Sequence, residues 1–282
     1  MKGTTKSKGQ KDELDKFYTN EEVAKKLIKK VDNLYKDKRP KYLEPSAGSG
    51  NFSNNIKNCI AIDIKPENKN IRQGDFLEYD WKDISENDFL IVIGNPPFGE
   101  SGKLALDFIK KASERADVIS FILPKGFMKD TFINRIPKNF HLVNGKRGEE
   151  LELNSFSFNG NDYKIPTVFQ IWEKRDYERK LISKKSIKND YIEFTTKDNA
   201  DFRIQRVGGN AGIASLDLNK AITSNYFIKN ISKMSNEELI SIINNLKYET
   251  IEYTTGPKSL SKGELISTLL EELNGWKTKT WF

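Results

Sequence analysis

Four consecutive residues about a third of the way along the chain combine an amide side chain with two prolines and an aromatic ring: Asn95, Pro96, Pro97 and Phe98. Adjacent prolines fix the backbone and remove two N–H donors, so the neighbouring carbonyls can point outward. The Asn95 side-chain oxygen and the Pro96 carbonyl can then accept both N–H bonds of one amino group. This arrangement suits an amine whose lone pair is delocalised, because two acceptors can hold the nitrogen as it becomes tetrahedral.

An amine held in this way can attack an electrophilic methyl group in line, with catalysis by positioning and preorganised dipoles rather than by a strong base. Phe98 could stack on a purine face, a contact worth about 1–3 kcal/mol per base. A target base inside a duplex would first be flipped out, at a cost of about a few kcal/mol. The run also has a structural interpretation, since paired prolines commonly end a strand and Phe98 could cap the core.

A second cluster lies earlier, where a short apolar run is followed by a loop with two glycines, residues 44–50. Glycines let the backbone approach a ligand closely, and a helix start after such a loop offers free N–H groups. A Gly-Ser-Gly run alone is weak evidence for a binding site, since most such glycine pairs only make tight turns. Its position after a predicted strand, however, favours a nucleotide site. The residues expected to bind a cofactor here are Glu44, Pro45, Ala47, Gly48 and Gly50.

Acidic residues follow the next two predicted strands. Asp63 ends one apolar run, where doubly wound nucleotide-binding folds place a carboxylate against ribose hydroxyls. Asp75 and Phe76 come at the next strand end and suit the amine and the ring of an adenine. We therefore expect all three to contact the cofactor.

The elements that position these residues alternate between strand and helix. Apolar runs predict buried strands at 42–43, 60–62, 89–93 and 118–123, and spaced apolar residues predict a helix at 104–112. This alternation indicates βαβ units and a doubly wound, mostly parallel α/β sheet, in which ligands bind at the carboxyl ends of the strands. A helix is also predicted from 21 onward, beginning at the capping-box pattern Thr19-Asn20-Glu21-Glu22.

The chain changes character near residue 140. Runs at 156–158 and 168–172 alternate like antiparallel strands joined by the turn-forming residues 159–162, and we expect this hairpin to close the sheet. We place a domain boundary near 175, which gives a flexible basic tail at 1–16, a catalytic domain at 17–175 and a small C-terminal α+β region at 176–282. Helices are predicted there at 236–246 and 262–273.

Composition narrows the function classes. The 282 residues include 47 Lys and Arg against 40 acidic residues, a formal charge of +7 that favours polyanionic partners but also occurs on ordinary surfaces. The chain has one cysteine, Cys59, and one histidine, His141. These numbers exclude a structural disulfide and any zinc site built mainly from Cys and His. We find no candidate metal site, no signal peptide and no membrane span, and we expect a cytoplasmic protein.

Over residues 14–175 the sequence resembles the class I S-adenosylmethionine-dependent amino-methyltransferases, specifically the N6-adenine DNA methyltransferases whose cofactor motifs precede the catalytic motif. Tyr18 and Thr19, preceded by Phe17, are similar to the family's leading motif, which borders the methionine part of the cofactor. The loop at 44–50 matches the cofactor loop, and Asn95 to Phe98 match the catalytic tetrapeptide. Asn20 departs from the pattern, because many relatives carry proline there.

The resemblance implies a Rossmann-like methyltransferase fold, S-adenosylmethionine as cofactor, and methyl transfer to the N6 amine of adenine in nucleic acid, with DNA as the expected partner. A restriction nuclease partner is left open. In the short C-terminal region, Arg203 and Arg206 lie on the same face just before a glycine turn and are expected to bind phosphates, although an exposed strand and hairpin explain them almost equally well.

Three other functions remain compatible with the sequence. RNA methyltransferases acting on adenine or guanine amines share the tetrapeptide, and so do release-factor glutamine methyltransferases, whose target amide also has two N–H bonds. An inactive nucleic-acid-binding subunit is a further alternative. Cytosine C5 methylation is disfavoured, because Cys59 is the sole thiol and lies outside the catalytic loop.

Overall fold

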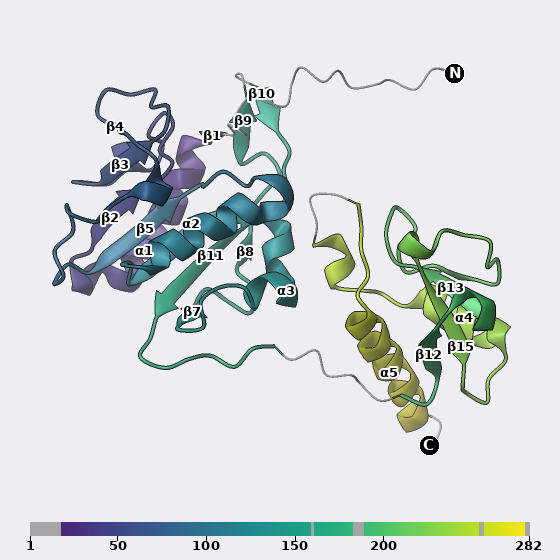
Figure 1. The fold of residues 1–282 in the computed structure, drawn as a ribbon. Helices are drawn as coiled ribbons and strands as arrows, with labels where there is room; N and C mark the ends of the chain where they lie inside the picture. Colours follow the sequence, from purple (N-terminus) through teal and green to yellow (C-terminus); the bar gives the residue numbers. More distant parts are fainter. Residues whose placement is uncertain (1–17, 159–160, 183–188, 254–256, 280–282) are drawn as a thin grey trace, which may run out of the picture. The chain divides into compact units, whose positions relative to one another are not determined.

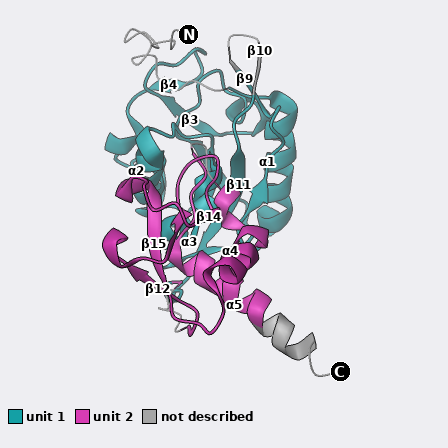
Figure 2. Ribbon diagram, turned by 90° about the vertical axis from the view of Figure 1, so that its right-hand side faces the viewer, with its two compact units in different colours: residues 1–181 teal, residues 182–282 magenta. Residues whose placement is uncertain are grey.

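The computed structural model describes residues 18–158, 161–182, 189–253 and 257–279. The basic tail expected at 1–16 lies outside the described residues. The chain forms two compact units, residues 1–181 and residues 182–282 (Figure 2). Each unit has its own sheet and its own hydrophobic core, so each is described by itself.

A mostly parallel sheet forms the centre of the first unit, with the strand order β4-β3-β2-β5-β6-β11-β7 (Figure 1). Five neighbouring strands run parallel, and β11 runs antiparallel to both β6 and β7. The strands are β2 (Lys41–Glu44), β3 (Ile60–Asp63), β4 (Arg72–Gln73), β5 (Leu90–Gly94), β6 (Val118–Pro124), β7 (Phe140–Leu142) and β11 (Thr167–Lys174), and the two-residue β8 (Glu149–Glu150) also pairs with β11.

The chain winds outward from the middle of this sheet in both directions. It passes from β2 to β3 and β4, returns to β5 beside β2, and continues to β6 on the other side. The helices α1 (Glu21–Tyr35) and α2 (Lys103–Ser113) lie on opposite faces of the sheet in both ribbon views (Figures 1 and 2). The doubly wound α/β fold with an added antiparallel strand is therefore confirmed, and its switch point lies between β2 and β5.

The central strands are apolar throughout because both faces of the sheet are covered. Every residue of β5 and β6 is buried. On one face, Ala24, Leu27 and Val31 of α1 pack in a common core with β5 residues such as Ile91 and Ile93. The strands and the α2 helix predicted from these apolar runs are confirmed, with ends that differ by at most one residue.

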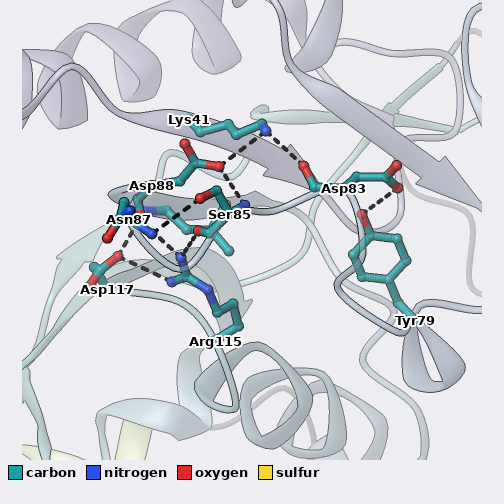
Figure 3. A network of polar contacts seen from close by, with 9 residues as sticks. Lys41, Tyr79, Asp83, Ser85, Asn87, Asp88, Arg115 and Asp117 are labelled. Atoms are coloured by element: carbon teal, nitrogen blue, oxygen red, sulfur yellow. Dashed lines mark hydrogen bonds and ion pairs between the residues drawn. The ribbon is translucent and has the colours of Figure 1, made fainter.

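A polar network ties together the beginnings of the parallel strands (Figure 3). At the start of β2, Lys41 Nζ donates to a carboxylate oxygen of Asp88 at 3.2 Å. Arg115 Nη2 donates to the Asp88 carbonyl at 3.0 Å, and Asp117, just before β6, accepts from the backbone N–H of Leu90 at 2.8 Å. These bonds align β2, β5 and β6 at one edge of the sheet, so the same strands end together at the opposite edge.

The prediction that the strands at 156–158 and 168–172 pair with each other in a hairpin is wrong. The strand β9 (Phe156–Phe158) pairs with β10 (Asn161–Tyr163) and with β1 (Tyr18–Thr19) in a separate small sheet. The long β11 instead inserts between β6 and β7, where its apolar residues are buried. Alternation identified two antiparallel strands correctly, but it could not tell which partner each one takes.

The capping box expected at the start of α1 is also absent. Asn20 is the N-cap residue and makes no side-chain cap hydrogen bond. Its amide group donates instead to the carbonyl of Asn154 at 2.7 Å, and its backbone N–H donates to the carbonyl of Ser155 at 2.9 Å. The residues before α1 are thus held by a distant segment of the chain.

The second unit is a small α+β body. Its antiparallel sheet has the order β12-β15-β13-β14 and packs against two helices through one apolar core. The helices predicted in this region are confirmed, and α4 begins with a capping box between Ser235 and Glu238. The elements are β12 (Ile192–Thr195), β13 (Phe202–Gln205), β14 (Ala214–Ser215), β15 (Asn225–Asn230), α4 (Asn236–Asn245) and α5 (Lys262–Lys279).

None of the helices in the described part of the chain is long and apolar enough to cross a membrane.

Candidate active site

A cavity of about 210 Å³ opens at the carboxyl ends of β2, β3, β4 and β5 in the first unit. Residues from six separate parts of the chain line it, including the strap before α1, the loop after β2 and the start of α2. The lining residues are Tyr18, Thr19, Glu44, Pro45, Ser46, Ala47, Gly48, Ser49, Asn51, Phe52, Asp63, Ile64, Gly74, Asp75, Phe76, Leu77, Asn95, Pro97, Leu104 and Phe108.

The loop after β2 passes under an aromatic ring at Gly48. The backbone there has φ of +54°, and a Cβ on Gly48 would lie 3.4 Å from the ring of Tyr18. The Asp63 carboxylate accepts the N–H of Gly48 at 2.7 Å and the N–H of Lys65 at 2.7 Å. Asp63, at the end of the neighbouring strand β3, therefore fixes the conformation of the loop. Glycine at position 48 allows both the positive φ and the close approach of the Tyr18 ring.

Glu44 lies at the base of the same loop and is 2% exposed. One of its carboxyl oxygens accepts the backbone N–H of Ser53 at 2.8 Å. Burial raises the pKa of Glu44 to about 8, against the lowering effect of hydrogen bonds from Ser53 and Phe52. An acidic side chain that is largely protonated at neutral pH thus lines the cavity, and a nearby cation would favour its ionised form.

The Asn95 loop leaves the sheet directly beside the loop after β2. Ser46 Oγ donates to the carbonyl oxygen of Asn95 at 3.0 Å. Just before it, the backbone of Gly94 lies against Glu44, and a Cβ on Gly94 would lie 3.3 Å from Glu44 Cγ. The two loops therefore contact each other at two successive residues.

Aromatic side chains form the wall of the cavity beyond β4. Phe76 is 1% exposed, and its ring lies 5.3 Å from that of Phe108 between centroids. Trp81 packs edge-on against Phe76 at 5.7 Å. Beside them, Asp75 is exposed and caps its own turn by accepting the N–H of Leu77 at 2.9 Å. An apolar aromatic wall therefore lies next to an exposed carboxylate.

A two-residue strap from the start of the described chain borders the opposite side. The Thr19 carbonyl accepts a hydrogen bond from the Asn51 amide at 2.6 Å, which fixes the strap to the loop after β2. The Tyr18 hydroxyl donates to Glu67, and burial together with this carboxylate raises the pKa of Tyr18 to about 12. The phenol is therefore protonated across the neutral range and acts as a donor.

Most residues that the sequence singled out in the first unit meet at this one cavity. Gly50, Pro96 and Phe98 do not line it. Gly50 turns the loop and donates to the Ala47 carbonyl at 2.7 Å, Pro96 is buried, and Phe98 packs against the core beneath α1. The lining residues that were predicted are Tyr18, Thr19, Glu44, Pro45, Ala47, Gly48, Asp63, Asp75, Phe76, Asn95 and Pro97.

The two arginines singled out in the second unit differ from each other. Arg203 is 8% exposed and donates to the Asp217 carbonyl at 2.8 Å and to the Asn225 side chain at 3.0 Å. These contacts hold the sheet to its covering loop, so the phosphate contact expected of Arg203 is replaced by a structural one. Arg206 is partly exposed, lies 5.5 Å over the ring of Tyr226, and forms no ion pair within the described residues.

Several lining residues were not predicted from the sequence. Ser46 and Asn51 belong to the loop after β2 and its continuation, but their contacts reach residues 49 and 32 positions away. Leu104 and Phe108 are spaced one helical turn apart on α2, so the same apolar pattern that predicted the helix also marked the face that reaches the cavity. Among the described residues, no group of three or more His, Cys, Asp and Glu side chains could hold a metal ion.

No protein-family model matches the sequence, and no curated protein matches it. Solved structures with a similar backbone include a proposed RNA methyltransferase from Pyrococcus horikoshii, with a TM-score of 0.42, 18% identity, and coverage of 57% of this chain and 88% of that one. Another is the 23S rRNA methyltransferase ErmE, with a TM-score of 0.38, 12% identity, and coverage of 58% and 71%.

A third similar structure covers most of this chain. It is a modification subunit of a proposed type I restriction enzyme from Vibrio vulnificus, with a TM-score of 0.42, 12% identity, and coverage of 93% of this chain and 62% of that one.

Proposed function

We propose that this chain transfers a methyl group from S-adenosylmethionine to the N6 amine of adenine in DNA. The observation that carries the proposal is the meeting of Asn95 and Pro97 with the cofactor loop in one cavity. A methyl donor seated in the loop and an amine held by Asn95 would then lie side by side. That proximity is the main requirement of an in-line transfer.

The polar groups of the cavity fit a nucleoside cofactor with a charged amino-acid tail. Thr19 is 4% exposed, and its hydroxyl has no hydrogen-bond partner within the described residues, although it lines the cavity. Asp63 can accept hydroxyl donors with the lone pairs that Gly48 and Lys65 leave free. Thr19 therefore suits the methionine part, and Asp63 suits the ribose.

The remaining walls complete this fit. The Phe76 and Phe108 rings suit the adenine face, and Asp75 suits the adenine amine. Asp63, and Glu44 when it is ionised, would also attract the positive charge of the sulfonium. When bound, S-adenosylmethionine supplies an electrophilic methyl group and leaves as a neutral thioether.

Asn95 and Pro96 supply the other half of the proposed chemistry. Their oxygens would accept the two N–H bonds of the target amine and stabilise the positive charge that develops on nitrogen during attack. The proton leaves after the methyl has been transferred, so the mechanism requires no strong base. The base would first be flipped out of the duplex. Phe98 would then stack on the purine, after a small movement that brings its half-buried ring toward the base.

The test is an assay of the full chain with isotope-labelled S-adenosylmethionine and four substrates: unmethylated genomic DNA, single-stranded DNA, RNA and a release factor. Genomic DNA is chosen because it contains every short recognition sequence. Label recovered as N6-methyl-2′-deoxyadenosine from DNA supports the proposal. Label in RNA, on guanine or on glutamine would replace it with one of the other functions, and no transfer to any substrate would contradict it.

A further inference from the structure

The Ser46 hydroxyl joins the two loops that the proposed reaction must hold together. Ser46 follows β2 and Asn95 follows β5, and these strands are parallel neighbours in the register Leu43 to Val92. The hydrogen bond from Ser46 Oγ to the Asn95 carbonyl, 3.0 Å long, therefore crosses from one strand end to the next. Both residues line the cavity.

The accepting carbonyl belongs to the peptide unit that joins Asn95 to Pro96. Its nitrogen is that of Pro96, which carries no hydrogen, and Pro97 lacks a donor as well. Backbone N–H groups are thus missing at two successive residues, and no N–H of either residue can anchor the loop. The hydrogen bond from Ser46 to the Asn95 carbonyl therefore helps to set the tilt of this peptide plane.

The tilt of that plane decides where both proposed acceptors point. The Asn95 side chain leaves the backbone on one side of the peptide unit, and the Pro96 carbonyl comes one residue later. A rotation of the unit would move both oxygens relative to the methyl donor. Displacements of about 1 Å at a reacting centre can lower a rate about a hundredfold.

We infer that Ser46 is a positioning residue that couples the cofactor loop to the orientation of the amine-accepting peptide. This inference rests on the proposed function. Because Ser46 lies in the loop that is proposed to bind the cofactor, its hydroxyl fixes the position of the amine acceptors relative to the methyl donor. Ser46 acts through Asn95 and takes no part in the bonds that form or break.

Kinetics of Ser46→Ala are the first test. We expect kcat to fall about ten- to a hundredfold while KM for S-adenosylmethionine changes less than threefold, since the N–H groups of the loop remain. Ser46→Thr keeps the hydroxyl and should restore most of kcat. The matched control is Ser113→Ala, which removes a serine-to-carbonyl bond of 2.6 Å at the end of α2 without touching the cavity.

A double-mutant cycle separates positioning from a general loss of structure. If Ser46 acts through Asn95, then Ser46→Ala should lower kcat little further in an Asn95→Ala background. Equal losses in both backgrounds would overturn the inference, and so would an unchanged kcat in the single variant.

Amide hydrogen exchange gives a readout that does not depend on activity. In Ser46→Ala, the amides of Asn95 and Phe98 should exchange faster, while those of β5 remain protected. Unchanged exchange at both amides would overturn the inference even if the wild-type protein methylates DNA. If the wild type methylates nothing but exchange does increase, the proposed function fails and the positioning contact stands.

Discussion

The Asp63 carboxylate reaches from the end of β3 to the loop after β2, where it accepts the backbone N–H of Gly48 at 2.7 Å. Its second oxygen accepts the N–H of Lys65 at 2.7 Å. The residue expected to bind ribose hydroxyls thus also shapes the loop that is proposed to bind the rest of the cofactor. One side chain would then serve both ligand binding and loop geometry.

Asp63→Ala should therefore weaken S-adenosylmethionine binding at least tenfold and also lower the melting temperature, because two backbone N–H groups lose their acceptor. Asp63→Asn keeps one acceptor oxygen and should fall between the wild type and the alanine variant in both measurements. Calorimetric titration and thermal unfolding check this. Asp107→Ala, which removes an exposed acid on α2, is the control. Unchanged affinity in Asp63→Ala would remove this residue from the site.

Glu44 predicts a dependence of stability on pH. Its pKa is about 8 in the folded chain against an ordinary value of 4.5, with burial as the largest cause. Between these values the unfolded chain ionises this group while the folded chain keeps it protonated. The unfolded state then binds fewer protons, so the contribution of Glu44 to stability falls as pH rises from about 4.5 to 8.

Denaturant unfolding at pH 5 and pH 8 checks this dependence. Glu44→Gln cannot ionise and should lose less stability than the wild type between the two pH values. The cofactor is cationic, so S-adenosylmethionine should bind the wild type more tightly as pH rises toward 8, and Glu44→Gln should lack this trend. Parallel pH profiles for the two proteins would show that Glu44 does not titrate in this range.

Asn95→Ala should separate binding from catalysis. Removing a preorganised dipole costs about 3 kcal/mol, or about a hundredfold in rate, while the cofactor loop stays intact. We expect normal S-adenosylmethionine affinity and poor methylation of adenine. Asn95→Asp retains an acceptor oxygen and should keep measurable activity. Wild-type rates in Asn95→Ala would mean that the proline-rich run only terminates β5.

The two arginines of the second unit should behave differently on substitution. Arg203→Ala leaves the buried Asn225 oxygen without its donor and should cost about 2 kcal/mol of unfolding free energy. Arg206→Ala should leave stability nearly unchanged and reduce the salt dependence of DNA binding by about one phosphate contact. Salt titrations of binding with both variants check this, and an unaltered slope in Arg206→Ala would assign that residue a structural role.

Local sequence patterns were sufficient to predict much of the first unit. Apolar runs predicted the central strands, apolar spacing predicted α2, and strand ends predicted that Asp63, Asp75 and Asn95 would lie together at one edge of the sheet. The structure has these positions, because a buried parallel strand must be apolar along its length, and because the residues after such strands meet at one edge. Sequence spacing alone is enough to place them there.

Pairing between distant segments required the tertiary structure. The sequence by itself determined the doubly wound α/β fold and the chemical character of the loops that follow β2 and β5. Only the folded chain decided that β9 pairs with β1 rather than β11, that Arg203 is buried, and that Ser46 reaches Asn95. These contacts depend on strand order and on which face each side chain occupies. Strand order and the facing of each side chain depend on the total apolar surface that the whole domain buries. A short stretch of sequence does not determine that total.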